Sequence, residues 1–145
     1  MVFRAKAFNE LSNLELYEIL KARSQVFMLE QNIHCQDMDG IDLAAKHYFL
    51  EEDRKLKAYL RAFYEDDSKE TVRIGRVLTI DRGIGLGATV VNSALADIKQ
   101  NMRCRQVFVD SQKHAIGFYE KMGFQIVSPE FLEEGIVHVR MQRDI

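Results

Sequence analysis

A glycine-rich segment, Arg82-Gly83-Ile84-Gly85-Leu86-Gly87, carries the clearest chemical signal in this sequence. It follows an apolar, β-branched stretch, residues 72–80, and precedes a helical pattern, residues 88–99. Glycines lack a Cβ atom and let backbone N–H groups approach a ligand closely. The first turn of a helix adds unpaired N–H donors and a partial positive charge. With the cation of Arg82 beside it, this turn predicts a cradle for the pyrophosphate of a cofactor.

Three kinds of phosphate-binding loop compete for this segment. A dinucleotide-binding fold requires G-x-G-x-x-G after the first strand and an acidic residue about 20 residues later. Here the spacing is G-x-G-x-G, the loop lies past the middle of the chain, and Met102 occupies the later position. An NTPase loop requires Gly-Lys-Ser/Thr, and neither Lys nor Ser follows Gly87. The third is the acetyl-coenzyme A loop of the GNAT acetyltransferases, Arg/Gln-x-x-Gly-x-Gly/Ala, which Arg82, Gly85 and Gly87 resemble in register. A glycine turn without a ligand is the remaining alternative.

A second segment, Ala115-Ile116-Gly117-Phe118-Tyr119-Glu120-Lys121-Met122-Gly123-Phe124, resembles the other GNAT signature, A-x-x-F-Y-x-K-x-G-F. It begins 28 residues after Gly87, with a helix and a short strand between, as that family orders them. By its pattern alone it is an amphipathic helix ended by Gly123, in which Phe118 and Met122 are also suited to an ordinary core. Because the two signatures occur together, in order and at the right spacing, the chain is identified as a member of the GNAT superfamily.

The N-terminal third resembles the ElaA-type branch of that superfamily. The residues that carry this resemblance are Arg23 to Gln31, Asp37 to Asp42, and His47. They resemble the pattern R-x-x-V-F-x-x-E-Q, then D-x-D-G-x-D, then His. The resemblance covers nearly the whole chain.

The order of elements predicts an α/β fold with one mixed sheet. A mostly antiparallel N-terminal meander followed by β-α-β-α-β places helices on both faces of such a sheet, and 145 residues favour a single domain, 1–145. The expected strands are 2–7, 48–51, 56–64, 72–79, 106–110, 124–127 and 136–141. The expected helices are 13–29, capped by Ser12 or Asn13, 88–99 and 115–122. Residues 31–45 are expected to form an irregular or short-helical connection.

The resemblance implies that acetyl-coenzyme A is the acyl donor and that an amine attacks its thioester directly. Backbone groups of Leu78, Thr79 and Ile80 are then expected to face the pantetheine arm, with an N–H near Leu78 polarising the thioester carbonyl. The residues expected to contact the cofactor are Leu78, Thr79, Ile80, Arg82, Gly83, Ile84, Gly85, Leu86, Gly87, Ala88, Gln112, Phe118 and Lys121.

Tyr119 matches the tyrosine that several GNAT enzymes use to protonate the leaving thiolate. A phenol with a pKa near 10 can donate to a thiolate with a pKa of about 8.5, and the alternative is a tyrosine that only packs on the cofactor. The candidate general bases are Glu30, His47 and His114, or a water held by one of them. His47 has the pKa range for a base at neutral pH. Glu30 could instead bind the substrate ammonium. The structural alternatives are a carbonyl-bonded His47, a helix-capping His114 and a solvated Glu30.

The acidic motif Asp37-x-Asp39-Gly40-x-Asp42 looks like part of a calcium loop but lacks the later ligands of an EF-hand. It predicts a turn stabilised by aspartate side chains, with a negative rim for a cationic amine as the alternative. Arg76 either pairs with these carboxylates or lies under the cofactor. No metal-ligand cluster is evident in the sequence.

Composition narrows the partners. A net charge of −2 gives no reason to expect a nucleic-acid or anionic-membrane partner, and no stretch approaches 18 apolar residues. Two cysteines, Cys35 and Cys104, without a secretion signal favour the cytoplasm. The expected partner is a small-molecule or peptide amine acceptor, and the protein is expected to be a monomer or a homodimer.

Three functions remain open for the sequence. The first is an acetyl-coenzyme A-dependent N-acetyltransferase, which the presence of Tyr119, Glu30 and His47 favours. The second is a non-catalytic sensor that binds coenzyme A or an acyl-coenzyme A. The third is an acyltransferase like the acyl-homoserine-lactone synthases, against which the compact size and the second signature weigh.

Overall fold

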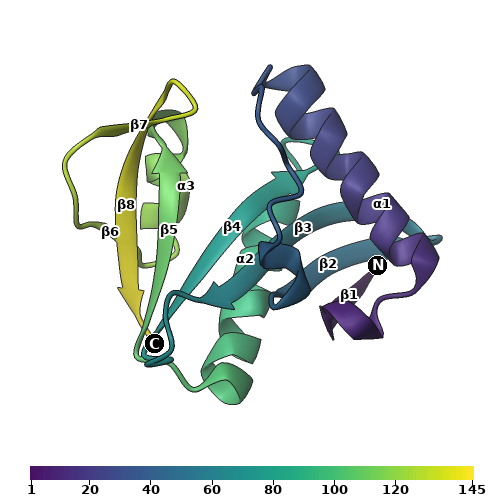
Figure 1. Ribbon diagram of the computed structural model, residues 1–145, viewed down its shortest axis with the longest axis horizontal. Coiled ribbons are helices and arrows are strands. Elements are labelled where there is room, and N and C mark those ends of the chain that lie inside the picture. Colours follow the sequence, from purple (N-terminus) through teal and green to yellow (C-terminus); the bar gives the residue numbers. More distant parts are fainter.

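The computed structural model describes every residue from Met1 to Ile145. Eight strands form one sheet (Figure 1) in the order β1-β2-β3-β4-β5-β8-β6, and β7 pairs with β8. The strands are β1 Val2–Ala7, β2 Lys46–Glu52, β3 Lys55–Tyr64, β4 Thr71–Thr79, β5 Gln106–Gln112, β6 Gln125–Ile126, β7 Phe131–Glu133 and β8 Ile136–Asp144. The helices are α1 Asn13–Arg23, α2 Leu86–Asp97 and α3 Ile116–Glu120. The mixed sheet and the GNAT-type order of elements confirm the predicted fold class.

The feature that creates a site is the divergence of β4 from β5. They are the one parallel pair of the sheet, and they pair over only four positions, from Thr71↔Gln106 to Ile74↔Val109. Beyond Ile74, β4 continues to Thr79 paired only with β3, and Figure 1 shows the two strands separating from their common end. The facing edges of both strands therefore carry backbone groups that the sheet does not use.

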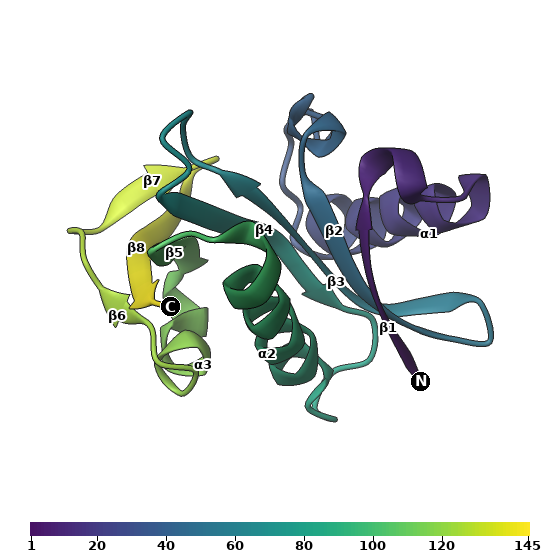
Figure 2. The same ribbon diagram turned by 90° about the horizontal axis from the view of Figure 1, so that it is seen from below.

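Helices cover both faces of the sheet, as expected, with α1 on one face and α2 on the other (Figure 2). Side chains alternate between these faces along each strand. Tyr48 and Leu60 belong to the large core beneath α2 and α3, whereas Phe49 and Tyr59 belong to the smaller core beneath α1. Both faces of the sheet are thus packed against buried side chains next to the point where it splits.

The first helix changes its winding before it ends. Ser12 caps α1 by accepting a hydrogen bond from the Glu15 N–H, and Glu15 bonds back to the Ser12 N–H, a box that contributes about 1 kcal/mol. The predicted helix 13–29 is α-helical only to Arg23 and continues as a π-helix, Ser24–Glu30. Wide turns of this kind occur often at functional sites, and this one delivers the chain to the cleft described below.

The second helix begins and ends differently from the prediction. It starts at Leu86, because Gly85 takes a left-handed conformation, φ +80°, as its N-cap. Its last turn, Ile98–Met102, is a π-helix, and the segment before α3, Lys113–Ala115, is a 3-10 turn.

The C-terminal strands also depart from the prediction. Strand β7 was not expected, β6 is shorter than predicted, and β8 extends beyond residue 141 to Asp144. These strands are defined by their pairing with β8, which local patterning does not reveal. None of the helices is both long enough and apolar enough to cross a membrane.

Candidate active site

A cleft of about 510 Å³ occupies the split between β4 and β5. Its walls come from segments far apart in the sequence. They are the middle of β4, the end of β5, the connection after the π-helix, the β7–β8 hairpin and Tyr119 of α3. A cleft at the open edge of two diverging strands can take an extended ligand that adds hydrogen bonds to a strand edge.

Near its end, β4 presents the backbone N–H and carbonyl groups of Thr79 to the split. The Ile80 N–H donates to the Lys57 carbonyl oxygen, 3.0 Å away, and Thr79 lies opposite Ala58. In an antiparallel pair, alternate residues point their backbone groups toward the partner strand. The backbone groups of Leu78 and Ile80 therefore face β3, and those of Thr79 face the split. The prediction that Leu78 and Ile80 present backbone groups to a pantetheine arm is corrected accordingly.

The glycine segment forms an open cradle at the start of α2. Gly83 and Gly85 both have φ +80°, and a Cβ atom at either would meet no protein atom within 4 Å. The first N–H groups of α2 have no helical acceptor, and a helix N-terminus attracts an anion. Side chains of Leu86 and Ala88 pack on the core, and Ile84 is exposed. Only the backbone of this segment is thus available to a pyrophosphate.

Gly87 has a different role from the other two glycines. A Cβ atom there would lie 3.2 Å from the ring of Phe118, in a backbone conformation that other residues can adopt. Gly87 therefore lets α2 approach α3, a packing role in addition to its predicted contact with the cofactor, which stays a prediction. Phe118 in turn packs edge-on against Tyr119, at 5.0 Å between ring centroids. Lys121 is exposed at the end of α3.

Arg82 and Glu30 form an exposed ion pair beside the cradle. The Nη2 atom of Arg82 lies 3.6 Å from a carboxylate oxygen of Glu30. Their side chains are 74% and 42% exposed, respectively. The Gln25 amide also donates to this carboxylate at 3.4 Å. Glu30 does not line the cleft, so this geometry favours a contact with Arg82 over the predicted role of general base.

Tyr119 is buried, yet its hydroxyl opens into the cleft. The residue is 6% exposed, its hydroxyl makes no hydrogen bond within the protein, and the hydroxyl oxygen keeps contact with solvent. Burial raises the pKa of Tyr119 above its usual value, so the phenol carries its proton at neutral pH. Two further predicted residues lie on the same cleft. His114 is exposed there, and the Gln112 amide donates to the Gln31 side-chain oxygen at 3.0 Å.

His47 is a structural residue in this fold. It is 1% exposed, and its Nε2 lies 2.9 Å from the Asp42 carbonyl oxygen. A carbonyl can only accept, so Nε2 carries the proton, and Nδ1 accepts from the Tyr59 hydroxyl at 2.7 Å. Burial lowers the pKa of His47. With its lone pair occupied and no access to the cleft, His47 is withdrawn as a candidate base.

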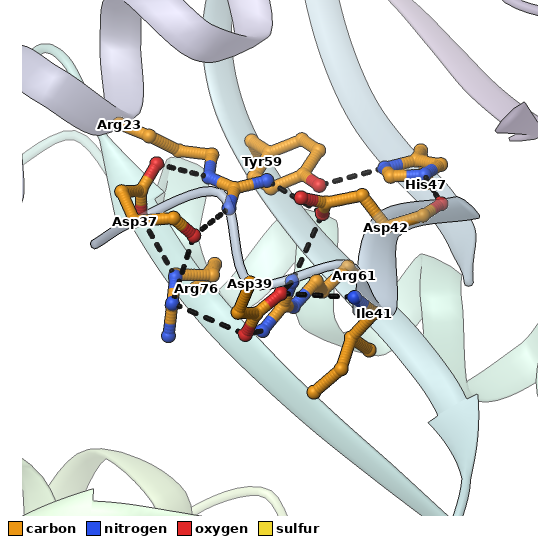
Figure 3. Close-up of polar contacts among 9 residues, drawn as sticks. All are labelled: Arg23, Asp37, Asp39, Ile41, Asp42, His47, Tyr59, Arg61 and Arg76. Atoms are coloured by element: carbon orange, nitrogen blue, oxygen red, sulfur yellow. Dashed lines mark hydrogen bonds and ion pairs between the residues drawn. The ribbon is translucent and has the colours of Figure 1, made fainter. Parts of the chain in front are cut away.

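The acidic motif forms an ion network with three arginines (Figure 3). Arg23, which is fully buried, bonds to Asp37 and Asp42 at 2.9 and 2.7 Å. The two other guanidiniums complete the network, since Arg61 bonds to Asp39 and Asp42 and Arg76 bonds to Asp37. The predicted pairing of Arg76 is confirmed.

This network excludes the alternative of a negative rim. Every carboxylate in it is bonded to a guanidinium, which neutralises the charge that a rim would need. Arg76 sits at a bulge of β4 with φ +53°, an uncommon conformation for a residue with a side chain. The network therefore fixes the bend of β4 at the mouth of the cleft.

His138 of β8 lines the cleft and was missed from the sequence. Its only signal in the sequence is the alternation of side chains along a strand. Because Val139 and Met141 point into the core, His138 and Arg140 must point to the other face of the sheet. Only the pairing of β8 with β5 places it opposite Gln112, at the cleft.

A sheet split between two parallel strands, with a glycine cradle at the following helix and a tyrosine at the split, defines the GNAT fold. A family model for the acetyltransferase (GNAT) domain matches residues 16–145, and the chain belongs to this family. Protein ElaA of Escherichia coli is 35% identical over 94% of this chain and 92% of its own. Its crystal structure superimposes with a TM-score of 0.91 over 98% of both chains.

Two further relatives agree with this assignment. A UPF0039 protein of Schizosaccharomyces pombe is 38% identical over 99% of this chain and 97% of its own. The structure of an acyl-CoA N-acyltransferase from Pseudomonas aeruginosa is 32% identical, with a TM-score of 0.89 over 99% of both chains. The AHL synthase LasI has a TM-score of 0.79 at 14% identity, a likeness that extends to the fold alone.

Proposed function

We propose that this protein transfers an acetyl group from acetyl-coenzyme A to an amine by direct attack of the amine on the thioester. The observation that carries the proposal is the hydroxyl of Tyr119. This hydroxyl is buried, makes no hydrogen bond within the protein, and opens into the cleft between the free edges of β4 and β5. Such a phenol is suited to donate a proton to a thiolate released in that cleft.

The other residues of the site have roles in binding. The N–H groups at the start of α2 and the cation of Arg82 hold the pyrophosphate. The free backbone groups of Thr79 hold the pantetheine arm along β4. Thioesters are already reactive, so rate enhancement comes mainly from holding the amine and the carbonyl carbon in contact.

The test combines binding with turnover. Calorimetry measures the affinity of the cradle for acetyl-coenzyme A. Release of free thiol in the presence of a panel of amines measures acetyl transfer. We expect binding and amine-dependent thiol release. Binding without turnover for any amine would favour a coenzyme A sensor, and activity only with long-chain acyl-carrier substrates would favour an acyl-homoserine-lactone-synthase-like reaction.

The cradle has a matched control. Asparagine tolerates a left-handed backbone, so Gly85→Asn places a side chain in the open cradle with little backbone strain. Gly135, in the β7–β8 turn, has φ +73° and equally open surroundings. Gly85→Asn should weaken acetyl-coenzyme A binding at least about tenfold, or about 1.4 kcal/mol, and Gly135→Asn should not. Equal affinities in both folded variants would refute the cradle.

A further inference from the structure

Among the histidines that line the cleft, only His138 is buried. It lies 91% buried on β8 and stacks on Phe131 of β7, with ring centroids 5.9 Å apart. Its strand position faces Gln112 across the β5–β8 ladder. Both residues line the cleft into which the Tyr119 hydroxyl opens. The ring is therefore fixed in place beside the position expected for the thioester.

One hydrogen bond decides the tautomer of this ring. Nδ1 of His138 lies 2.7 Å from the backbone carbonyl oxygen of Ile136. A carbonyl oxygen only accepts, so Nδ1 carries the proton and the neutral ring has its lone pair on Nε2. That nitrogen makes no hydrogen bond within the protein and keeps contact with solvent. In His47 the lone pair is occupied by the Tyr59 hydroxyl, whereas in His138 it is open.

The surroundings of this nitrogen favour a cation. The Glu133 carboxylate lies 3.6 Å from Nε2 of His138, and the neighbouring Glu134 is an exposed carboxylate on the same wall of the cleft. The other charged groups nearby are paired or exposed. Along the ladder Arg140 bonds to Asp110, and in the 3-10 turn Lys113 pairs with Glu130 while His114 is exposed. An ammonium placed between Glu133 and Nε2 would therefore meet a carboxylate and a lone pair.

We propose that His138 is the general base for the acceptor amine and that Glu133 holds the acceptor's ammonium group before its proton is removed. The inference rests on the proposed function and assigns the acceptor as a primary amine that is protonated in solution. Nε2 of His138 takes one proton from R–NH3⁺ and passes it to solvent. The neutral nitrogen attacks the thioester carbon, a C–N bond forms and the C–S bond breaks. A second proton leaves the nitrogen and reaches the coenzyme A sulfur, with Tyr119 as the relay.

The first experiment needs no turnover. Nitrogen-detected NMR of the histidine rings in the full-length protein should show His138 as the Nδ1–H tautomer at neutral pH. Benzylammonium should shift its Nε2 resonance in the wild type and shift it far less in Glu133→Gln. A Nε2–H tautomer, or equal shifts in both proteins, would overturn the assignment. This readout stands even when no acetyl transfer is detected, so it separates a failed base from a failed proposed function.

The second experiment uses two acceptors that differ in protonation. Benzylamine is protonated at neutral pH, whereas semicarbazide is neutral there and needs no base to become a nucleophile. His138→Gln should lower kcat/KM for benzylamine about a hundredfold and abolish the acidic break in its pH profile. With semicarbazide the loss should stay within about threefold.

The control variant for this experiment is His114→Gln, which changes the exposed histidine on the same cleft. It should leave the acidic break of the benzylamine profile in place. Equal losses for both acceptors in His138→Gln would reduce His138 to a structural residue, as would an unchanged pH profile. A His114→Gln profile without the break would transfer the role to His114.

Discussion

The ring of Phe118 fills the space that a Cβ atom at Gly87 would need, at 3.2 Å from its nearest ring carbon. These two residues belong to the two signature segments that identify the family. Gly87 is the second residue of α2, next to the cradle, and Phe118 lies next to Tyr119 on α3. The glycine therefore couples the position of the cradle to the position of the tyrosine.

The contact can be measured as a coupling energy. Alanine at Gly87 overpacks against Phe118, which costs about 1–3 kcal/mol, and the gain in helix propensity offsets about 1 kcal/mol of this. We expect Gly87→Ala to destabilise the wild type and to stabilise Phe118→Leu, in which the smaller side chain leaves room. Urea unfolding of the four proteins should give a coupling of about 1 kcal/mol. Additive effects would show that the two side chains do not compete for space.

Arg82 should contribute to cofactor binding through its charge. Arg82→Ala should weaken acetyl-coenzyme A binding several-fold with little change in melting temperature, because the side chain is exposed. Added salt should weaken wild-type binding more than binding by the variant, since the lost contact is ionic. Glu30→Gln is the matched change, because it removes the competitor for Arg82 and should bind at least as tightly as the wild type. Calorimetry at two salt concentrations checks both, and weaker binding by Glu30→Gln would mean that the carboxylate holds Arg82 in its binding position.

Tyr119 should affect turnover more than binding. Tyr119→Phe keeps the packing against Phe118 and Phe124 and removes only the hydroxyl. If this hydroxyl protonates the thiolate, kcat should fall about a hundredfold, and acetyl-coenzyme A affinity should stay within about twofold. Steady-state kinetics with calorimetry separates the outcomes. Full kcat would make solvent the proton donor, and a parallel loss of affinity would make Tyr119 a binding residue.

The ion network should make stability depend on pH in the acid range. Hydrogen bonds from Arg61 hold the pKa of Asp39 at about 2, against about 3.9 in an unfolded chain. A depressed folded pKa means that the stabilisation is complete above the unfolded value and is lost as the pH falls from about 4 to about 2. The difference in unfolding free energy between the wild type and Asp39→Asn should therefore shrink over that window. Urea titrations from pH 6 to pH 2.5 check it, and a constant difference would contradict it.

At neutral pH, Asp42→Asn should lower the free energy of unfolding more than Asp39→Asn does. Burial would raise the pKa of Asp42, but bonds from Arg23 and Arg61 outweigh it and lower the pKa. Asp42→Asn leaves these two buried guanidiniums with less counter-charge, a kind of change that costs about 3–5 kcal/mol. The same urea experiment at pH 7 ranks the two variants.

The sequence by itself determined the fold class and the family, and it located the segments that the proposed cofactor site uses. The signals that could be read are local ones, because a left-handed turn, a helix start and a helix face each depend on neighbours in the chain. They are Arg82 with Gly83, Gly85 and Gly87, and the pair Phe118-Tyr119. The pairing of Arg76 with the aspartates could also be predicted, because the positive charge of Arg76 and the acidic motif 37–42 are both apparent in the sequence. The helix and strand boundaries shifted where long-range pairing sets them, as in β7 and β8.

Only the tertiary structure decided which side chains can act. His47 and His138 look alike in sequence, but one has its lone pair bonded to Tyr59 and the other opens into the cleft. Gly87 and Gly85 look alike, but one faces Phe118 and the other faces open space. Each difference comes from a contact between residues far apart in the chain. His47 meets Tyr59, 12 residues later, through sheet pairing, and Gly87 meets Phe118, 31 residues later, through helix packing. Residue types set what chemistry is available, and the contacts made across the fold set which nitrogen or hydroxyl is left free to perform it.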